Sequence, residues 1–316
     1  MEISDFKSEQ DYLAQMDRGM LLNPRVDSTF KALFTQPTPE SRAALKSFLE
    51  AAIEQKIKTV ELRPNDSPAE FFGQRGVSYD ITCELDNGIN AEIELQSFKQ
   101  KYDYAKRAEY QVARLQTTYL KKGQNWESAP VVYQISILGF IYTKKTKNAV
   151  NRFAMRTKDG VELANALNVV FVELPKIRRF EKTVETNTKL ENWAIFLKDA
   201  DKPEKQVIID KITSREEGLM QAKKSLSNIS KNRDYWIAQY HQELHERDLR
   251  SSLQAAERKG IAQGIAQGIA QGRAEGILAG ERNARIETAR LMLINKMPVI
   301  DISKYTGLTL DEIAQL

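Results

Sequence analysis

Two carboxylates and one amide in the first third of the chain have the types and spacing needed for metal-assisted chemistry. Asp80 and Glu94 are fourteen positions apart, and Gln96 follows Glu94 by two. Carboxylates held side by side repel each other unless a cation lies between them. Magnesium suits such a pair, because it prefers one or two protein carboxylates and takes further ligands from water and substrate phosphates. The alternative is a polar strand face exposed to solvent, on which the acids have no function.

The segment that carries these residues, 77–97, is predicted to be a β-hairpin, because apolar and polar side chains alternate around an Asp-Asn-Gly turn. If residues 86–88 form the loop and Gly88 is left-handed, facing positions sum to 174 and every pair matches in polarity. A two-residue loop would set apolar against polar at every pair, so the pattern selects the register. The polar face then carries Ser78, Asp80, Thr82 and Glu84 opposite Gln96, Glu94, Glu92 and Asn90. Asp80 therefore faces Glu94, with Cβ atoms about 5 Å apart.

Around the hairpin, helical and strand patterns alternate. Apolar residues at helical spacing predict two amphipathic helices before it, around residues 26–34 and 45–53. After it we expect a basic, tyrosine-rich helix at 98–122, a strand at 131–143, a basic helix or loop, and a second strand at 167–174. From Leu190 onward the pattern is helical. This order predicts an α/β fold followed by an all-α region, with the change between residues 190 and 215.

Composition excludes several classes of protein. The 316-residue chain is 41% hydrophobic and 28% charged, which is typical of a globular protein and excludes wholesale disorder or an end-to-end coiled coil. Cys83 is the single cysteine, and His241 and His245 lie on a charged helical stretch, so a disulfide, a zinc cluster and histidine catalysis are not expected. The sequence shows no signal peptide and no apolar run of membrane-spanning length, so we expect a cytoplasmic protein without a membrane partner.

The net charge of +4 conceals an uneven distribution. Residues 1–96 hold 10 basic and 17 acidic side chains, whereas residues 97–190 hold 18 basic and 8 acidic side chains. An acidic segment next to a basic one suits a site where carboxylates hold a cation and a positive surface holds a phosphate backbone. Charge runs are more often solvated faces, so this asymmetry alone does not establish nucleic acid binding.

The order Asp80, then Glu94-Leu95-Gln96 on a partner strand, resembles the bipartite site of PD-(D/E)XK nucleases. It is most similar to the recombination-promoting nuclease and transposase (Rpn) family, in which glutamine replaces the final lysine. Further segments that resemble this family are Asp27-Ser-Thr-Phe-Lys-Ala-Leu-Phe34, Arg107, Tyr110, Trp193 within LENWAIFL, a glycine tract and the final TGLTLDEIAQL. The resemblance covers roughly residues 20–316.

The resemblance implies a restriction-endonuclease-like core, with a mixed sheet flanked by helices, and a role for each matching residue. Asp80 and Glu94 would be metal-binding catalytic carboxylates, and the backbone carbonyl of Leu95 a further ligand. Gln96 would be the counterpart of the lysine. Asp27 resembles an accessory acid of the metal site, with capping of its own helix as the alternative. The cofactor would be Mg²⁺, with Mn²⁺ as an alternative.

The resemblance also implies an activity and a substrate. The protein would be a metal-dependent DNA endonuclease that acts in recombination or transposition. The alternative is a non-catalytic assembly or regulatory protein built on a degenerate nuclease fold. The missing lysine and the interaction-like tail favour this alternative, whereas the two acids and Gln96 on one strand face favour the enzyme.

The basic helix after the hairpin is the candidate DNA surface, because basic side chains bind phosphates irrespective of sequence and tyrosines can stack on bases. Its basic residues are Lys99, Lys101, Lys106, Arg107, Arg114, Lys121 and Lys122, interleaved with Tyr102, Tyr104, Tyr110 and Tyr119. The candidate contacts are Lys106, Arg107, Tyr110 and Arg114. Arg107 and Arg114 are seven positions apart and share one helix face. Alternatively, the tyrosines are buried against the sheet and the lysines are merely solvated.

Glycine recurs at every fourth position from Gly260 to Gly280, and GIAQ is written three times in succession. Each glycine costs a helix about 1 kcal/mol relative to alanine, so the tract must pack against a partner or flex. Four residues turn a helix by about 400°, so the glycine stripe slips by about 40° per repeat and a supercoiling second helix could follow it. Self-association or another protein partner, and a mobile hinge, are the alternatives.

The end of the chain is predicted to form a small helical unit with a capping box between Thr309 and Glu312. Residues 297–316 hold one basic and three acidic side chains, which argues against a DNA-reading helix. We expect this unit to bind protein or to fold back on the core. The expected divisions are an extension (1–20), a nuclease-like domain (21–200), a helical region (201–258), the glycine repeat (259–282) and the small unit (283–316).

Overall fold

A computed structural model of the chain describes residues 6, 8–67, 76–86, 88–100, 102–120 and 122–316. Its centre is a sheet with the strand order β1-β4-β5-β6-β8-β7. These strands are β1 (Val60–Arg63), β4 (Ile81–Leu85), β5 (Asn90–Gln96), β6 (Val132–Leu138), β7 (Val150–Ala154) and β8 (Leu167–Glu173). Strands β5, β6 and β8 run parallel, whereas the β1–β4, β4–β5 and β7–β8 pairs are antiparallel. The sheet is therefore mixed, as expected.

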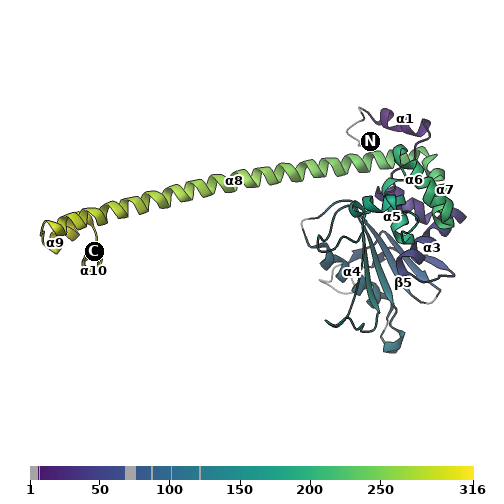
Figure 1. Cartoon of the computed structure of the whole chain (residues 1–316), viewed down its shortest axis with the longest axis horizontal. Helices are drawn as coiled ribbons and strands as arrows, with labels where there is room; N and C mark the ends of the chain where they lie inside the picture. Colours follow the sequence, from purple (N-terminus) through teal and green to yellow (C-terminus); the bar gives the residue numbers. More distant parts are fainter. Residues whose placement is uncertain (1–5, 7, 68–75, 87, 101, 121) are drawn as a thin grey trace. The chain divides into compact units, whose positions relative to one another are not determined.

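Helices cover both faces of this sheet. The larger group packs on the main core and comprises α1 (Glu9–Asp17), α2 (Asp27–Thr35), α3 (Pro39–Ile53), α5 (Lys189–Asp199), α6 (Gln206–Arg215) and α7 (Glu217–Ser230). Helix α4 (Tyr104–Tyr119) covers the other face and packs on β6 and β8 through Ala108, Val112 and Leu115. Figure 1 shows α3, α5, α6 and α7 gathered together, with α4 apart from them against the sheet. Short 3₁₀ helices are η2 (Trp126–Ser128), η3 (Leu174–Lys182) and η4 (Pro203–Lys205).

The main core is built around fully buried aromatic side chains. Phe34 on α2, Phe48 on α3 and Trp193 on α5 contact one another with ring centroids 5.4 to 5.8 Å apart. Helix α3 begins where the Thr38 hydroxyl accepts a hydrogen bond from Ser41 N–H, directly before a proline that is preset for a helical first turn. The two amphipathic helices expected before the hairpin are thus present and supply much of this core.

The hairpin of β4 and β5 has the predicted register. Ile81 faces Ile93 and Glu84 faces Asn90, so facing positions sum to 174. Gly88 has φ of 74°, the left-handed conformation that the three-residue loop requires. The middle residue of that loop, Asn87, lies outside the described residues. The polarity pattern was sufficient to select the register.

The predicted hairpin is wrong at its open end. Ser78 does not face Gln96, because β3 (Val77–Ser78) instead pairs with β2 (Asp66–Ser67) in a separate small sheet. The β4–β5 ladder stops where the next N–H groups have other acceptors: Tyr79 N–H donates to the Asn65 carbonyl and Leu95 N–H to Asp80 Oδ2, both at 2.8 Å. The Asn65 side chain lies on the β1 side of β4, where its amide donates to the Asp80 carbonyl at 2.9 Å and its Oδ1 accepts from Thr82 N–H at 3.2 Å.

Two edge strands fall outside the expected elements. Strand β7 lies in the stretch predicted as a basic helix or loop, and β1 precedes the hairpin. Most side chains of β1 are exposed, and Arg152 of β7 leaves the strand to donate to the Ala52 carbonyl of α3 at 2.8 Å. An edge strand pairs on one side and carries polar residues, so its alternation is a weak signal.

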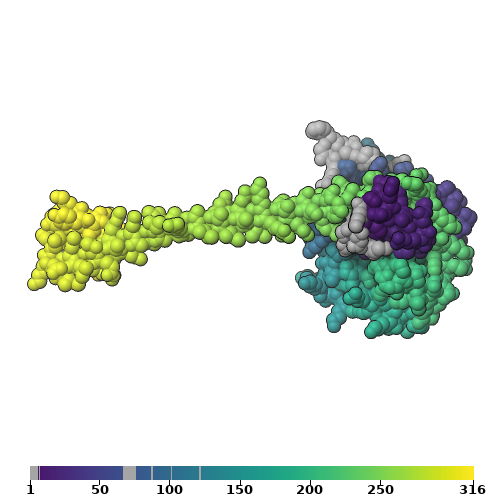
Figure 2. Space-filling view, turned by 90° about the horizontal axis from the view of Figure 1, so that it is seen from above, coloured from purple at the N-terminus to yellow at the C-terminus, as the bar shows by residue number. Residues whose placement is uncertain are grey.

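The chain divides into two compact units, Met1–Leu244 and His245–Leu316. The expected finer divisions, after residues 20, 200, 258 and 282, stay a prediction. Helices α6 and α7 and the first turns of α8 (Arg233–Ile294) share the main core, where Trp236 is 1% exposed. Helix α1 also belongs to this unit, since the Tyr12 ring packs on Trp236 at 5.9 Å, and Figure 2 shows α1 in purple on this surface.

The second unit contains the glycine tract as part of continuous helix α8. Helices α9 (Val299–Thr306) and α10 (Leu310–Ala314) pack on the end of α8 around Ala289 and Ile302, and the predicted capping box at Thr309 is present. The small unit thus folds against its own long helix. Within the described residues, every helix is too short or too polar to cross a membrane.

Candidate active site

The carboxylates of Asp80 and Glu94 come together at the open end of the hairpin. Asp80 directly precedes β4, and Glu94 lies near the end of β5. The backbone N–H of Leu95 donates to Asp80 Oδ2 at 2.8 Å, which holds the Asp80 carboxylate beside the strand that carries Glu94. The two acids are close enough for the charge of Asp80 to raise the pKa of Glu94. The structure therefore brings the two acids together, although Asp80 precedes β4 and is not paired with Glu94 in the ladder as predicted.

Glu94 is buried beneath α4 and is held by three donors. These are Gln111 Nε2 at 2.8 Å from Oε1, and Arg107 Nη2 at 3.3 Å and Gln96 Nε2 at 3.4 Å from Oε2. Burial raises the pKa of Glu94 to about 7 and the charge of Asp80 adds to the rise, while the three donors oppose it. The carboxylate thus titrates near neutral pH, and a bound cation would favour its charged form.

The part of the polar hairpin face that carries Glu94 is buried, so it is not the solvent-exposed face of the alternative. Helix α4 covers it, and Thr82, Glu92 and Glu94 are at most 2% exposed. Neither carboxyl oxygen of Glu92 has a hydrogen-bond partner among the described residues. Burial, with the charge of Glu94 in addition, raises the pKa of Glu92 well above its usual range. Glu92, to which the sequence pattern assigned no role, is therefore a buried acid behind the site, and its burial favours the neutral form.

Asp27 reaches the site through a lysine that sequence reasoning did not single out. Lys31 Nζ lies 2.9 Å from Asp27 Oδ2 and 3.1 Å from Asp80 Oδ1. Helix α2 begins at Asp27 without a side-chain cap, so the structure does not show the capping alternative. Burial raises the pKa of Asp27. The charge of Asp80 adds to this rise, and the contact with Lys31 opposes it. The sequence feature that could have indicated this lysine is its spacing from Asp27, because residues four positions apart lie one helical turn apart on the same face.

Hydrogen bonds from β5 and α8 hold the elements around the site. The Ser97 hydroxyl donates to the Arg25 carbonyl at 3.1 Å and joins the end of β5 to the segment before α2. Two glutamines of α8 accept hydrogen bonds around the amino end of α2. These run from Asn23 N and Thr29 Oγ1 to Gln239 Oε1, both at 2.9 Å, and from Ser28 N to Gln242 Oε1 at 3.2 Å.

The four candidate DNA contacts on α4 do not share one surface. Lys106 and Tyr110 are exposed, whereas Arg107 turns to the site and donates to Tyr102 Oη at 3.1 Å as well as to Glu94. Arg114 is 6% exposed, because the face it shares with Arg107 is directed at the sheet. Arg114 is thus buried away from the exposed surface that carries Lys106 and Tyr110. Lys101 and Lys121 lie outside the described residues.

The donor atoms at the site fit a hard divalent cation. They are carboxylate and carbonyl oxygens, which suit magnesium or manganese. Three carboxylates, on Asp27, Asp80 and Glu94, meet two cations, on Lys31 and Arg107, so the ionised cluster has an excess of negative charge. In the part of the chain that the structure describes, no three His, Cys, Asp or Glu side chains form a ready-made metal cluster. A cation here would complete its coordination with water and substrate oxygens.

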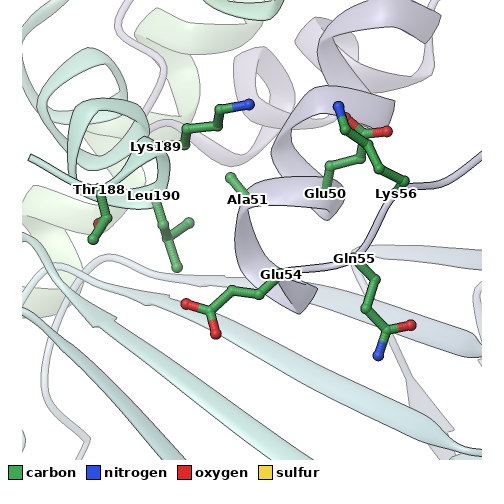
Figure 3. Close-up of a pocket in the computed structure, with 8 residues that line it drawn as sticks. All are labelled: Glu50, Ala51, Glu54, Gln55, Lys56, Thr188, Lys189 and Leu190. Atoms are coloured by element: carbon green, nitrogen blue, oxygen red, sulfur yellow. The ribbon is translucent and has the colours of Figure 1, made fainter.

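A cavity of about 270 Å³ lies elsewhere, at the end of α3 and the start of α5. Figure 3 shows its lining residues: Glu50, Ala51, Glu54, Gln55, Lys56, Thr188, Lys189 and Leu190. None of them belongs to the carboxylate site, and Lys56 already pairs with Glu50 at 3.5 Å. The cavity is therefore separate from the candidate active site.

A mixed sheet with two acids at the open end of an antiparallel hairpin defines an α/β protein of the nuclease-fold class. Residues 24–256 match the family described as PD-(D/E)XK nuclease family transposase, and the chain belongs to this family. The matched segment includes Asp27, Lys31, Asp80 and Glu94. The resemblance seen in the sequence is thereby confirmed, as is the fold class. No curated protein and no solved structure matched the chain.

Proposed function

We propose that the protein is a metal-dependent endonuclease that hydrolyses DNA and acts in recombination or transposition. The observation that carries this proposal is the hydrogen bond from Leu95 N–H to Asp80, because it sets the Asp80 carboxylate beside Glu94. Membership of a nuclease family supports the class of reaction. The cytoplasmic location expected from the sequence stays part of the same proposal.

The residues proposed to hold the metal are Asp80, Glu94 and the backbone carbonyl of Leu95, with Asp27 as an accessory acid. When bound, magnesium or manganese would neutralise charge on the phosphate and lower the pKa of a water molecule. Gln111 and Arg107 would keep the buried Glu94 carboxylate oriented, since both donate to it in the structure.

Hydrolysis forms a bond between a water oxygen and phosphorus and breaks the bond from phosphorus to one sugar oxygen. That sugar oxygen takes one proton of the water, and the other proton stays on the new phosphate. Gln96 is proposed to orient the attacking water. Its amide nitrogen donates to Glu94 at 3.4 Å, which leaves its carbonyl oxygen as an acceptor for a water O–H. A neutral amide supplies no positive charge.

The proposed DNA surface is the exposed side of α4 next to the site. Lys106 and Tyr110 lie on it, and Arg107 is at its border with a side chain 36% exposed. A lysine there would bind phosphates of any sequence, and the tyrosine ring could stack on a base or pack along a sugar. This surface positions DNA and does not read its sequence.

The test is cleavage of supercoiled plasmid DNA by the purified protein with and without magnesium or manganese. We expect nicking that stops in EDTA and falls by at least about 1000-fold in Asp80→Asn and Glu94→Gln. Glu61→Gln, on β1 with a side chain 68% exposed, is the control and should cleave like the wild type. Equal activity in the wild type and both site variants would reveal a contaminant and reject the proposal.

A second candidate function is a non-catalytic assembly or regulatory protein on the same fold. It is favoured by the neutral Gln96 and by the internal pairs Asp80–Lys31 and Glu94–Arg107, which partly neutralise the site without a metal. Such a protein would bind DNA equally well in EDTA and in magnesium. Its unfolding temperature would also not respond to manganese, whereas a metal-binding site is stabilised by its ligand.

We also infer that the protein self-associates through the glycine tract. Ile261, Ile265 and Ile269 repeat with the same spacing and are 57%, 58% and 66% exposed. A Cβ added at Gly264 or Gly268 would meet nothing within 4 Å, so there is room for a second helix to approach closely. Burying the isoleucines would offset the roughly 6 kcal/mol that six glycines cost a helix. The alternative to self-association is that the glycine tract acts as a mobile hinge.

A further inference from the structure

A lysine of α2 lies between two carboxylates of the candidate site. The Lys31 ammonium is 2.9 Å from Asp27 and 3.1 Å from Asp80. The first contact is a pair within one helix, whereas the second joins α2 to the residue before β4. Lys31 therefore links two acids that come from separate elements, at the point where the proposed chemistry takes place.

The scaffold holds Lys31 in this place and leaves part of it accessible. Phe30 and Leu33, on the same helix, are fully buried in the main core. The Lys31 side chain itself is 37% exposed. A fixed backbone combined with a partly exposed ammonium allows contact with a substrate at a defined position.

Within the described residues, the cation that contacts Asp80 is Lys31, whereas Arg107 contacts Glu94. Position 96, where the PD-(D/E)XK pattern ends in lysine, holds the neutral Gln96. Arg107 is engaged by the buried Glu94 and by Tyr102. Lys31 uses two of its three N–H donors on carboxylates, so one remains for a phosphate oxygen.

We propose that Lys31 supplies from α2 the positive charge that the general PD-(D/E)XK pattern places at position 96, and that it binds the scissile phosphate. This inference rests on the proposed nuclease function. A cation aimed at the phosphate stabilises the negative charge that builds on its oxygens during attack. The effect depends on where the charge lies in space, so an ammonium from another helix can replace one from β5.

The test moves the charge back to position 96. Lys31→Met keeps an unbranched side chain but removes the ammonium, and Lys31→Met with Gln96→Lys restores a lysine at the motif position. At saturating manganese we expect Lys31→Met to slow plasmid nicking about 100-fold and the double variant to recover at least about tenfold. Lys31→Arg should keep more activity than Lys31→Met. Lys56→Met, which breaks the pair with Glu50 outside the site, is the matched control and should match the wild type.

Manganese binding without DNA, measured by electron paramagnetic resonance, separates charge supply from a structural role. Lys31→Met should bind manganese at least as tightly as the wild type, because no ammonium then competes for Asp80. Loss of manganese binding would mean that Lys31 only positions Asp80, and would overturn the inference. Thermal unfolding shows whether each variant is folded, and Lys31→Gln replaces Lys31→Met in every comparison if the latter does not fold.

Two cleavage results would also overturn the inference. One is a Lys31→Met rate within about threefold of the wild type, and the other is a folded double variant no faster than the single one. A wild type that does not cleave DNA rejects the proposed function and this inference together. A cleaving wild type with an unaffected Lys31→Met rejects this inference alone.

Discussion

Replacing Glu94 with glutamine should stabilise the protein at pH 8 and have little effect at pH 5. The Glu94 side chain is 2% exposed, and burial, with the charge of Asp80 in addition, raises its pKa from 4.5 to about 7. The unfolded chain releases this proton near pH 4.5, whereas the folded protein keeps it until about pH 7. The folded state therefore binds more protons between these values, and stability falls as the pH rises through them.

The size of the effect follows from that interval. At about 1.36 kcal/mol per pH unit, the distance from 4.5 to about 7 corresponds to about 3 kcal/mol. Glutamine has the shape of a protonated carboxyl group and never becomes charged, so the variant avoids this loss. Glu92 adds a pH dependence of the same sign, because its pKa is also raised, and the comparison must be between variant and wild type at each pH.

Urea unfolding followed by tryptophan fluorescence measures this difference, because Trp193 and Trp236 are buried in the core of the first unit. The measurements are made at pH 5 and pH 8 in EDTA. The control is Glu84→Gln on the same hairpin face, whose side chain is 35% exposed and pairs with Arg63, and it should gain no stability at pH 8. If Glu94→Gln gains nothing at pH 8, or gains equally at both pH values, the electrostatic account of the site is wrong.

Three other substitutions test separate parts of the protein. Gln96→Lys should keep or raise the nicking rate, and a rate more than about tenfold lower would show that Gln96 is not the counterpart of lysine. Lys106→Ala should weaken binding to all DNA sequences and reduce the slope of log affinity against log salt by about 0.9; an unchanged slope would remove α4 from the DNA surface. Leucine at Gly264, Gly268 and Gly272 adds a few kcal/mol of helix propensity but fills the groove, so light scattering should report a smaller particle. If the wild type and the variant are both monomers of the same mass, the tract does not self-associate and the mobile-hinge hypothesis is favoured.

The hairpin could be predicted from the sequence because its determinants are local. Alternating polarity and one glycine select the register of residues 81–84 against 90–93, which sets Asp80 at the end of the ladder next to the part of β5 that carries Glu94. The end of the β4–β5 ladder before Ile81 could not be predicted, since the N–H groups of Tyr79 and Leu95 donate to the Asn65 carbonyl and the Asp80 carboxylate, and neither bond leaves a trace in the strand pattern. The edge strands were missed because they are short and lack a regular alternation of buried and exposed side chains: Leu62 of β1 and Phe153 of β7 are exposed.

The electrostatics of the site could not be predicted, because they depend on which helix covers which face of the sheet. Polarity alone suggested an exposed hairpin face, but α4 buries Glu92 and Glu94 and so raises the pKa of both. The same packing turns Arg114 inward, although its position seven residues after Arg107 was compatible with a surface stripe. Lys31 was hidden for a related reason, since its contact with Asp80 spans two elements that only the folded core brings together.

The first turns of α8 belong to the scaffold of the site and not to the tail. Gln239 and Gln242 accept hydrogen bonds from the chain around Asp27, so removing them would release the amino end of α2. A fragment that retains the site must therefore extend to Leu244, where the first compact unit ends. The coupling is also reciprocal: a cation that orders the amino end of α2 must stabilise these turns of α8 by the same free energy that an ordered α8 contributes to cation binding.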